Sequence, residues 1–76
     1  MITKKRIYNI TELQKLQNLA TKCKDDVTIT SEDGTVHVDA KSFIGLFALD
    51  FTKPVFVVSE NAEFHQAIAR VGETLE

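Results

Sequence analysis

Few residues in this sequence carry side chains that commonly perform covalent chemistry. There is one cysteine, Cys23, and there are two histidines, His37 and His65. A thiolate or an imidazole can act as a nucleophile or bind a metal ion. The three residues match no metal-binding spacing and no glycine-rich phosphate loop occurs, so no metal site and no cofactor is expected. We interpret Cys23 as a buried inert thiol, His37 as an exposed strand residue and His65 as a solvated helix residue.

Ser42 stands directly before an apolar run, residues 43–49, and has two compatible interpretations. As a helix N-cap, its hydroxyl oxygen accepts a hydrogen bond from a backbone N–H, which contributes about 1 kcal/mol. As a regulatory phosphorylation site, it would place about two negative charges at the positive end of that helix. The residues alone favour the cap, and both interpretations stay open.

Segment 43–49 holds more apolar side chains than one short helix can bury against one sheet. A helix that is apolar all round must cover its second face somewhere. We assign Leu46 and Leu49 to the core. Phe43, Ile44 and Phe47 either complete a small core or form an exposed apolar patch, and both alternatives stay open.

The elements that position these residues follow from hydrophobic periodicity. Alternation in residues 27–30 and 35–38, with Asp33-Gly34 between them, predicts a β-hairpin. Before the hairpin we expect a charged edge strand at 3–8 and a helix that starts with a Thr11–Gln14 capping box and ends near Lys24. After it we expect a short helix at 43–49 and a strand at 55–58. A last helix is expected to carry the apolar stripe Phe64, Ile68, Val71 and Leu75.

This order, β-α-β-β-α-β-α, predicts one domain, residues 1–76, of the α+β class. A four-stranded antiparallel sheet would carry three helices on one face. Thr28, Thr30 and His37 are expected on the other face, in water. The residues expected to face the helices are Val27, Ile29, Val36 and Val38.

The composition fits a small globular protein, because 43% of the 76 residues are hydrophobic and 26% are charged. No apolar run reaches the roughly 18 residues that span a bilayer, and no signal peptide is recognisable, so we expect a cytoplasmic protein without membrane insertion. Residues 1–24 carry six Lys or Arg and one Glu, whereas residues 25–76 carry three Lys or Arg and ten acidic residues. The acidic whole disfavours nucleic acid as a partner. The basic residues 1–24 either form a solvated surface or bind an acidic partner or a phosphate.

The order of elements, together with Ala20-Thr21-Lys22 and the run Lys41–Leu49, resembles HPr, the small phosphocarrier of the bacterial sugar phosphotransferase system. Lys41, Ser42, Gly45 and Leu49 match the family's pattern identity for identity. The resemblance covers roughly residues 3–76. It implies an HPr-like open-faced β-sandwich with strand order 1-4-2-3 and three helices on one face.

The chain departs from HPr where that family carries its phosphate. HPr uses a histidine at the start of its first helix, followed by an arginine and a proline. Here Asn9 takes the place of the histidine, Thr11 of the arginine and Glu12 of the proline. An asparagine amide is no nucleophile for phosphoryl transfer, and Glu12 would repel a phosphate. We therefore predict that the chain is not an enzyme and accepts no phosphoryl group by this route.

The resemblance also implies a second site. In Gram-positive relatives, the serine that matches Ser42 is phosphorylated by an ATP-dependent kinase, and the product binds a transcription regulator of carbon catabolite control. Some HPr-like variants have lost the histidine and kept this serine. In HPr the positions that match Phe43, Ile44 and Phe47 dock partner proteins.

The expected function is that of an HPr-like, non-catalytic regulatory or interaction protein, which docks partners through its second helix and is regulated at Ser42. The expected partners are phosphotransferase-system proteins, a transcription regulator or a serine kinase. One alternative is a phosphocarrier that uses a non-standard residue. Another is a structural subdomain that binds an unrelated partner through the same helix.

Overall fold

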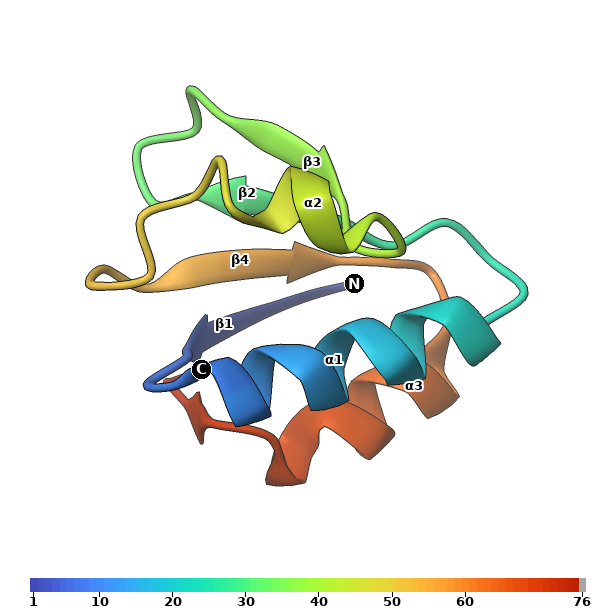
Figure 1. Ribbon diagram of the computed structural model, residues 1–76. Helices are drawn as coiled ribbons and strands as arrows, with labels where there is room; N and C mark the ends of the chain where they lie inside the picture. The colour runs from blue at the N-terminus through green and yellow to red at the C-terminus, as the bar shows by residue number, and fades with distance from the viewer. Residues whose placement is uncertain (76) are drawn as a thin grey trace.

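A computed structural model describes residues 1–75 of the chain, and its fold is of the predicted α+β class (Figure 1). The described residues form three α-helices, a 3-10 turn and five strands. In chain order these are β1 (Ile2–Arg6), α1 (Ile10–Lys22), β2 (Thr28–Ser31), β3 (His37–Asp39), α2 (Phe43–Leu46), β4 (Val55–Val58), α3 (Ala62–Ala67), the 3-10 turn η1 (Ile68–Arg70) and β5 (Glu73–Thr74). None of these helices is long and apolar enough to cross a membrane.

The five strands form one antiparallel sheet in the order β3-β2-β4-β1-β5. The prediction of four strands in the order 1-4-2-3 was therefore wrong in the number of strands and in the full order. The difference is β5, which pairs with the outer side of β1, whereas β1, β4, β2 and β3 are themselves neighbours. Lys5 pairs with Thr74 and Arg6 with Glu73, so the C-terminal half of β1 is not a sheet edge.

The predicted last helix was wrong beyond Ala67, because the chain first tightens into η1 and then turns back toward β1. Gly72 makes this turn with a φ of 63°. A Cβ atom at this position would lie 2.6 Å from the carbonyl oxygen of Arg6, so only glycine fits both the backbone conformation and the space. Leu75 consequently follows β5 and is exposed instead of ending a helical stripe.

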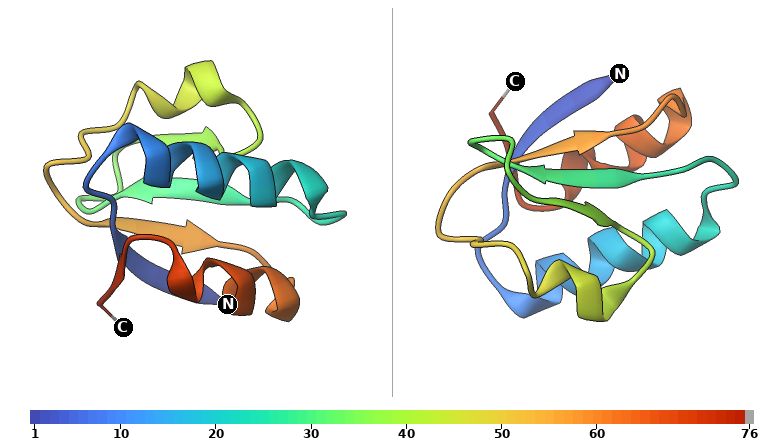
Figure 2. Two further views of the ribbon diagram at one scale, coloured as in Figure 1. Left: turned by 60° about the horizontal axis from the view of Figure 1, so that its bottom comes forward. Right: turned by 90° about the horizontal axis from the view of Figure 1, so that it is seen from above.

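The helices pack against one face of the twisted sheet and enclose a single hydrophobic core (Figure 2). The predicted stripe of α1 is buried at Leu13, Leu16 and Ala20. The helix ends at Lys22, and Cys23 follows as its C-cap. Its thiol side chain is only partly buried, whereas the sequence interpretation expected it to be buried. From the other elements, the core takes Ile7, Val27, Ile29, Ala40, Leu46, Leu49, Val55, Val57, Phe64, Ile68 and Val71.

The β2–β3 hairpin has the predicted facing. Ile29 is buried and Val38 packs against the core, whereas His37 is exposed on the opposite face, with its Nδ1 3.1 Å from the Thr30 hydroxyl. The turn is held by Asp33, whose carboxylate accepts hydrogen bonds from the Ser31 hydroxyl and from the backbone and hydroxyl of Thr35. These bonds, that from Ser31 first, lower the pKa of Asp33 to about 2.

The interpretation of His65 as a solvated residue was wrong, because its side chain is buried between α3 and the sheet. Its Nε2 lies 2.8 Å from the carbonyl oxygen of Ser59, and its Nδ1 lies 2.7 Å from the Thr3 hydroxyl. A carbonyl oxygen only accepts, so Nε2 carries the proton, and in the neutral ring Nδ1 accepts from Thr3. The imidazole thus ties α3 to β1 and to the end of β4.

Candidate functional site

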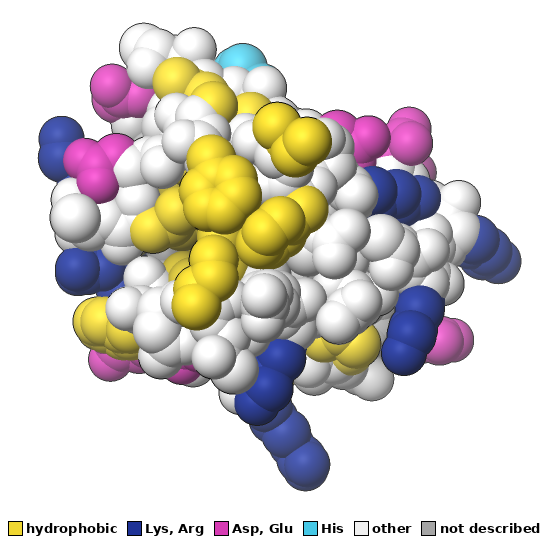
Figure 3. Space-filling view, in the orientation of Figure 1, with side chains coloured by type: hydrophobic (Ala, Val, Ile, Leu, Met, Phe, Trp, Pro, Cys, Tyr) yellow, Lys and Arg dark blue, Asp and Glu magenta, His cyan; other side chains and the backbone are white. Residues whose placement is uncertain are grey.

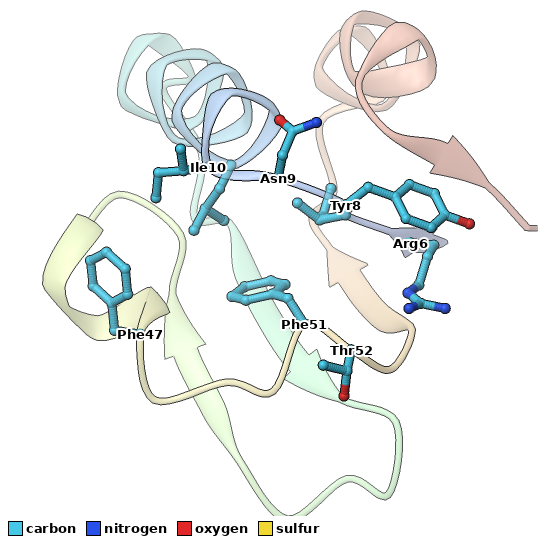
Figure 4. A pocket seen from close by; sticks show the side chains of 9 residues that line it. Arg6, Tyr8, Asn9, Ile10, Phe47, Phe51 and Thr52 are labelled. Atoms are coloured by element: carbon cyan, nitrogen blue, oxygen red, sulfur yellow. The ribbon is translucent and has the colours of Figure 1, made fainter.

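The candidate site is a groove of about 370 Å³ between the start of α1, the end of α2 and the loop that follows α2 (Figure 4). Three segments of the chain meet there: the connection from β1 to α1, the first turns of α1, and residues 47–52. The groove is lined by Arg6, Ile7, Tyr8, Asn9, Ile10, Leu13, Phe47, Phe51 and Thr52.

One side of the groove continues into an apolar patch, which we define as Ile10, Ile44 and Phe47. These side chains are 49%, 85% and 60% exposed. Figure 3 shows hydrophobic side chains gathered on this face of the molecule, over α2 and the start of α1. The Phe47 ring meets the Phe43 ring edge to face, with 5.1 Å between their centroids.

Segment 43–49 therefore has two sides. Leu46 and Leu49 are buried, which confirms their assignment to the core. Phe43 is partly buried against that core. Ile44 and Phe47 remain in water, so the small core does not absorb them.

The start of α1, where the HPr histidine would stand, satisfies its own hydrogen bonds. Asn9 is the N-cap, and its Oδ1 accepts from the Glu12 backbone N–H at 2.9 Å. The Glu12 carboxylate accepts from the Tyr8 backbone N–H at 2.7 Å. The predicted Thr11–Gln14 capping box was wrong because the helix begins two residues earlier than that pattern required. An anion at this helix end would meet the Glu12 carboxylate.

At the other end of the groove lies a group formed by Arg6, Tyr8 and Glu73. The Arg6 guanidinium lies over the Tyr8 ring, 5.0 Å from its centroid. The Tyr8 hydroxyl donates to Glu73 Oε1 at 2.6 Å, and this hydrogen bond raises the pKa of Tyr8. Within residues 1–75, Arg6 forms no ion pair, and its Nε is buried without an acceptor.

Ser42 lies outside the groove at the start of α2, with an exposed side chain. Its Oγ accepts a hydrogen bond from the Gly45 backbone N–H at 3.3 Å, which confirms it as an N-cap. The bond is long and the helix has only four residues, so the cap contributes little to stability. Ser42 is nevertheless only one residue from Phe43 and two from Ile44 in the patch.

The remaining chemically capable residues lie elsewhere. His37 is on the open face of the sheet, and Cys23 borders a separate hollow between α1 and α3. In the part of the chain that the structure describes, no three His, Cys, Asp or Glu side chains are grouped so that they could hold a metal ion.

The sequence interpretation missed several groove residues, namely Arg6, Tyr8, Ile10 and Phe51. One signal was present: Tyr8 and Ile10 stand on both sides of the cap residue Asn9, where neither a strand nor a helical stripe buries them. Of the predicted site residues, Asn9 and Phe47 both line the groove, whereas Ser42, Phe43 and Ile44 do not. Searches with this chain among protein-family models, curated proteins and solved structures found no match.

Proposed function

We propose that this chain is a non-catalytic interaction module that docks a protein partner on the groove and the apolar patch beside it. The observation that carries the proposal is the division between buried and exposed residues at α2: Leu46 is completely buried, whereas Ile44 on the same short helix is 85% exposed and Phe47, its C-cap, is 60% exposed. Exposed apolar side chains that gather beside a hollow are typical of protein interfaces, since a partner removes them from water.

The shape of the site supports a protein partner. A rigid aromatic anchor beside a pocket is the usual centre of an interface. Phe47 is held by its contact with Phe43 and has the groove beside it, so a partner could fill the groove and cover the ring at once. The patch and the groove come from α1, α2 and the following loop, which the core fixes relative to one another.

The HPr resemblance gives the proposal its partner class. In that family the helix matching α2 docks partners, so we propose phosphotransferase-system proteins or a transcription regulator as the proteins bound here. The hydrogen bonds of Asn9 and Glu12 favour docking over phosphate transfer, because the helix start is occupied by its own carboxylate. The adjacency of β1, β4, β2 and β3 is compatible with this kinship.

We further propose Ser42 as the residue that regulates docking when it is phosphorylated. Its hydroxyl is exposed, and its cap bond is long at 3.3 Å, so modification would disturb the fold little. A phosphate there would bring about two negative charges next to Phe43 and Ile44. It would act on partner choice through charge, with the shape of the domain unchanged.

The test is retention of partners from an extract of the native cell by the parent and by Phe47→Asp. Ile2→Asp is the matched control, because Ile2 is 65% exposed but lies on β1, away from the groove. Phe47→Asp should lose a partner that the parent and the control retain, with its melting temperature near that of the parent. Ser42→Asp should also keep its melting temperature but change the retained set.

Equal retention by Phe47→Asp and the parent would refute docking at this site. If Phe47→Asp instead unfolds the domain, the ring belongs to the core and the patch is not a docking surface.

A further inference from the structure

We propose that the groove recognises an acidic segment with an apolar anchor in its protein partner, and that Arg6 pairs with the carboxylate of that segment. The inference rests on the proposed docking function and specifies the chemistry of the partner. It is carried by the Arg6 guanidinium, which forms no ion pair within residues 1–75 and lies at one end of an apolar groove.

Arg6 keeps part of its hydrogen-bonding capacity unused within the described residues. Its Nε is the one buried side-chain nitrogen or oxygen there that lacks a partner. The one ion pair in residues 1–75 is between Lys4 and Glu32, so no carboxylate of this part of the chain neutralises Arg6. Buried polar groups in native proteins nearly always have hydrogen-bond partners, and Arg6 Nε is an exception within the described residues.

The carboxylates near the groove are already engaged. Glu73 is the cross-strand neighbour of Arg6, but its Oε1 accepts from the Tyr8 hydroxyl at 2.6 Å. Glu12 accepts from the Tyr8 backbone N–H. Asp50 accepts from the backbone and the hydroxyl of Thr52, bonds that lower its pKa. The guanidinium is therefore the charged group at this site that is left for a partner.

The position of Arg6 gives the groove two chemically different ends (Figure 4). Arg6 and Tyr8 lie at one end, Ile10 and Phe47 at the other, and Phe51 lies between them. The guanidinium lies over the Tyr8 ring, and this cation–π contact favours its position at that end. A partner segment that fits both ends needs an apolar side chain for the Phe47 end and a carboxylate for Arg6.

A carboxylate suits this position better than a phosphate. The Glu12 and Glu73 side chains both bond to Tyr8, so a phosphate dianion on Arg6 would meet two neighbouring negative charges. A carboxylate carries half that charge, and the apolar anchor supplies the remaining attraction.

The experiment is selection of random short peptides, displayed on phage, against the immobilised folded protein. The parent should enrich peptides that combine Asp or Glu with Phe, Leu or Met. Arg6→Gln should keep the apolar enrichment, lose the acidic one, and bind the parent's acidic peptides about tenfold more weakly. Arg70→Gln, which removes an exposed arginine outside the groove, should select like the parent.

Arg6→Lys provides a second variant if Arg6→Gln does not fold. Lysine keeps the positive charge but lacks the planar guanidinium, so this variant should still bind acidic peptides, with reduced affinity. In a separate measurement, added salt should weaken the binding of acidic peptides to the parent protein.

The outcomes separate the two proposals. If the parent enriches apolar peptides that lack acidic residues, and Phe47→Asp no longer binds them, the role of Arg6 is refuted and the docking proposal stands. No enrichment by the parent, or enrichment that Phe47→Asp does not change, would refute both.

Discussion

Two regions of the molecule reverse the usual placement of polar and apolar side chains. The charged side chain of Lys5 is completely buried, whereas the apolar side chain of Ile44, in the apolar patch, is 85% exposed. The first reversal is resolved inside the chain, because Lys5 Nζ donates to the Thr74 hydroxyl at 2.6 Å. The exposed Ile44 side chain, in contrast, is covered by no other residue within residues 1–75. A buried charge with an internal partner belongs to the fold, and uncovered apolar surface points to a partner outside it.

The electrostatics of Lys5 fit this distinction. Burial lowers the pKa of the ammonium group, and the opposing influence of the Glu12 carboxylate is weaker. The site thus destabilises the folded protein when Lys5 is charged, and Thr74 reduces that penalty.

The largest expected effect separates the buried and the exposed residues of segment 43–49. Leu46→Ala should lower the free energy of unfolding by about 3 kcal/mol, because it removes a completely buried side chain and leaves a cavity. Phe47→Ala, on the exposed side, should cost about 1 kcal/mol at most, from its contact with Phe43. Urea unfolding of both variants measures the difference, and equal losses would place Phe47 in the core.

A smaller effect is expected when Lys5 loses its partner. Thr74→Val should lower the free energy of unfolding by about 2 kcal/mol, since it leaves a buried ammonium without an acceptor. Lys5→Met together with Thr74→Val should be nearly neutral, because both polar partners are then gone. A double-mutant cycle that shows no coupling would mean that Lys5 does not depend on β5.

The smallest effect is the dependence of stability on alkaline pH. The folded pKa of Lys5 lies below its ordinary 10.5, so between these two values the unfolded chain binds more protons, and stability should rise with pH. The raised pKa of Tyr8 has the opposite sign, so stability falls as that group titrates. The measurement is therefore made with Tyr8→Phe, and Lys5→Met in the same background should remove the rise. A rise that persists without Lys5 would contradict the assignment.

The central sheet could be predicted because its signals are local. Residues 27–30 and 35–38 alternate, Asp33-Gly34 specifies the turn, and residues 55–58 form an apolar run. Likewise the N-cap role of Ser42 needs only the residues that follow it. Each of these features depends on chain neighbours, so the sequence is sufficient to predict it.

The features that were missed depend on residues far apart in the chain. His65 is buried because Thr3, 62 positions away, meets its ring. The spacing of Val71 and Leu75 favoured a helix, but the close approach of Gly72 to Arg6 decides for a strand. Similarly, no local pattern indicates that Phe51 lies in the same groove as Tyr8.

The pairing of β1 with β5 has a consequence for how the chain is made. Lys5 and Thr74 are 69 positions apart, and the other neighbour of β1 is β4, at residues 55–58. A ribosome adds about 5–20 residues per second, so β1, which precedes the other four described strands, waits seconds for either neighbour, while β2 and β3 follow each other closely in the chain. During that wait the basic stretch from Lys4 to Arg6 is unpaired. The sheet is therefore completed only when β1 meets β4 and β5, and a chain that lacks β5 presents Lys5 to water.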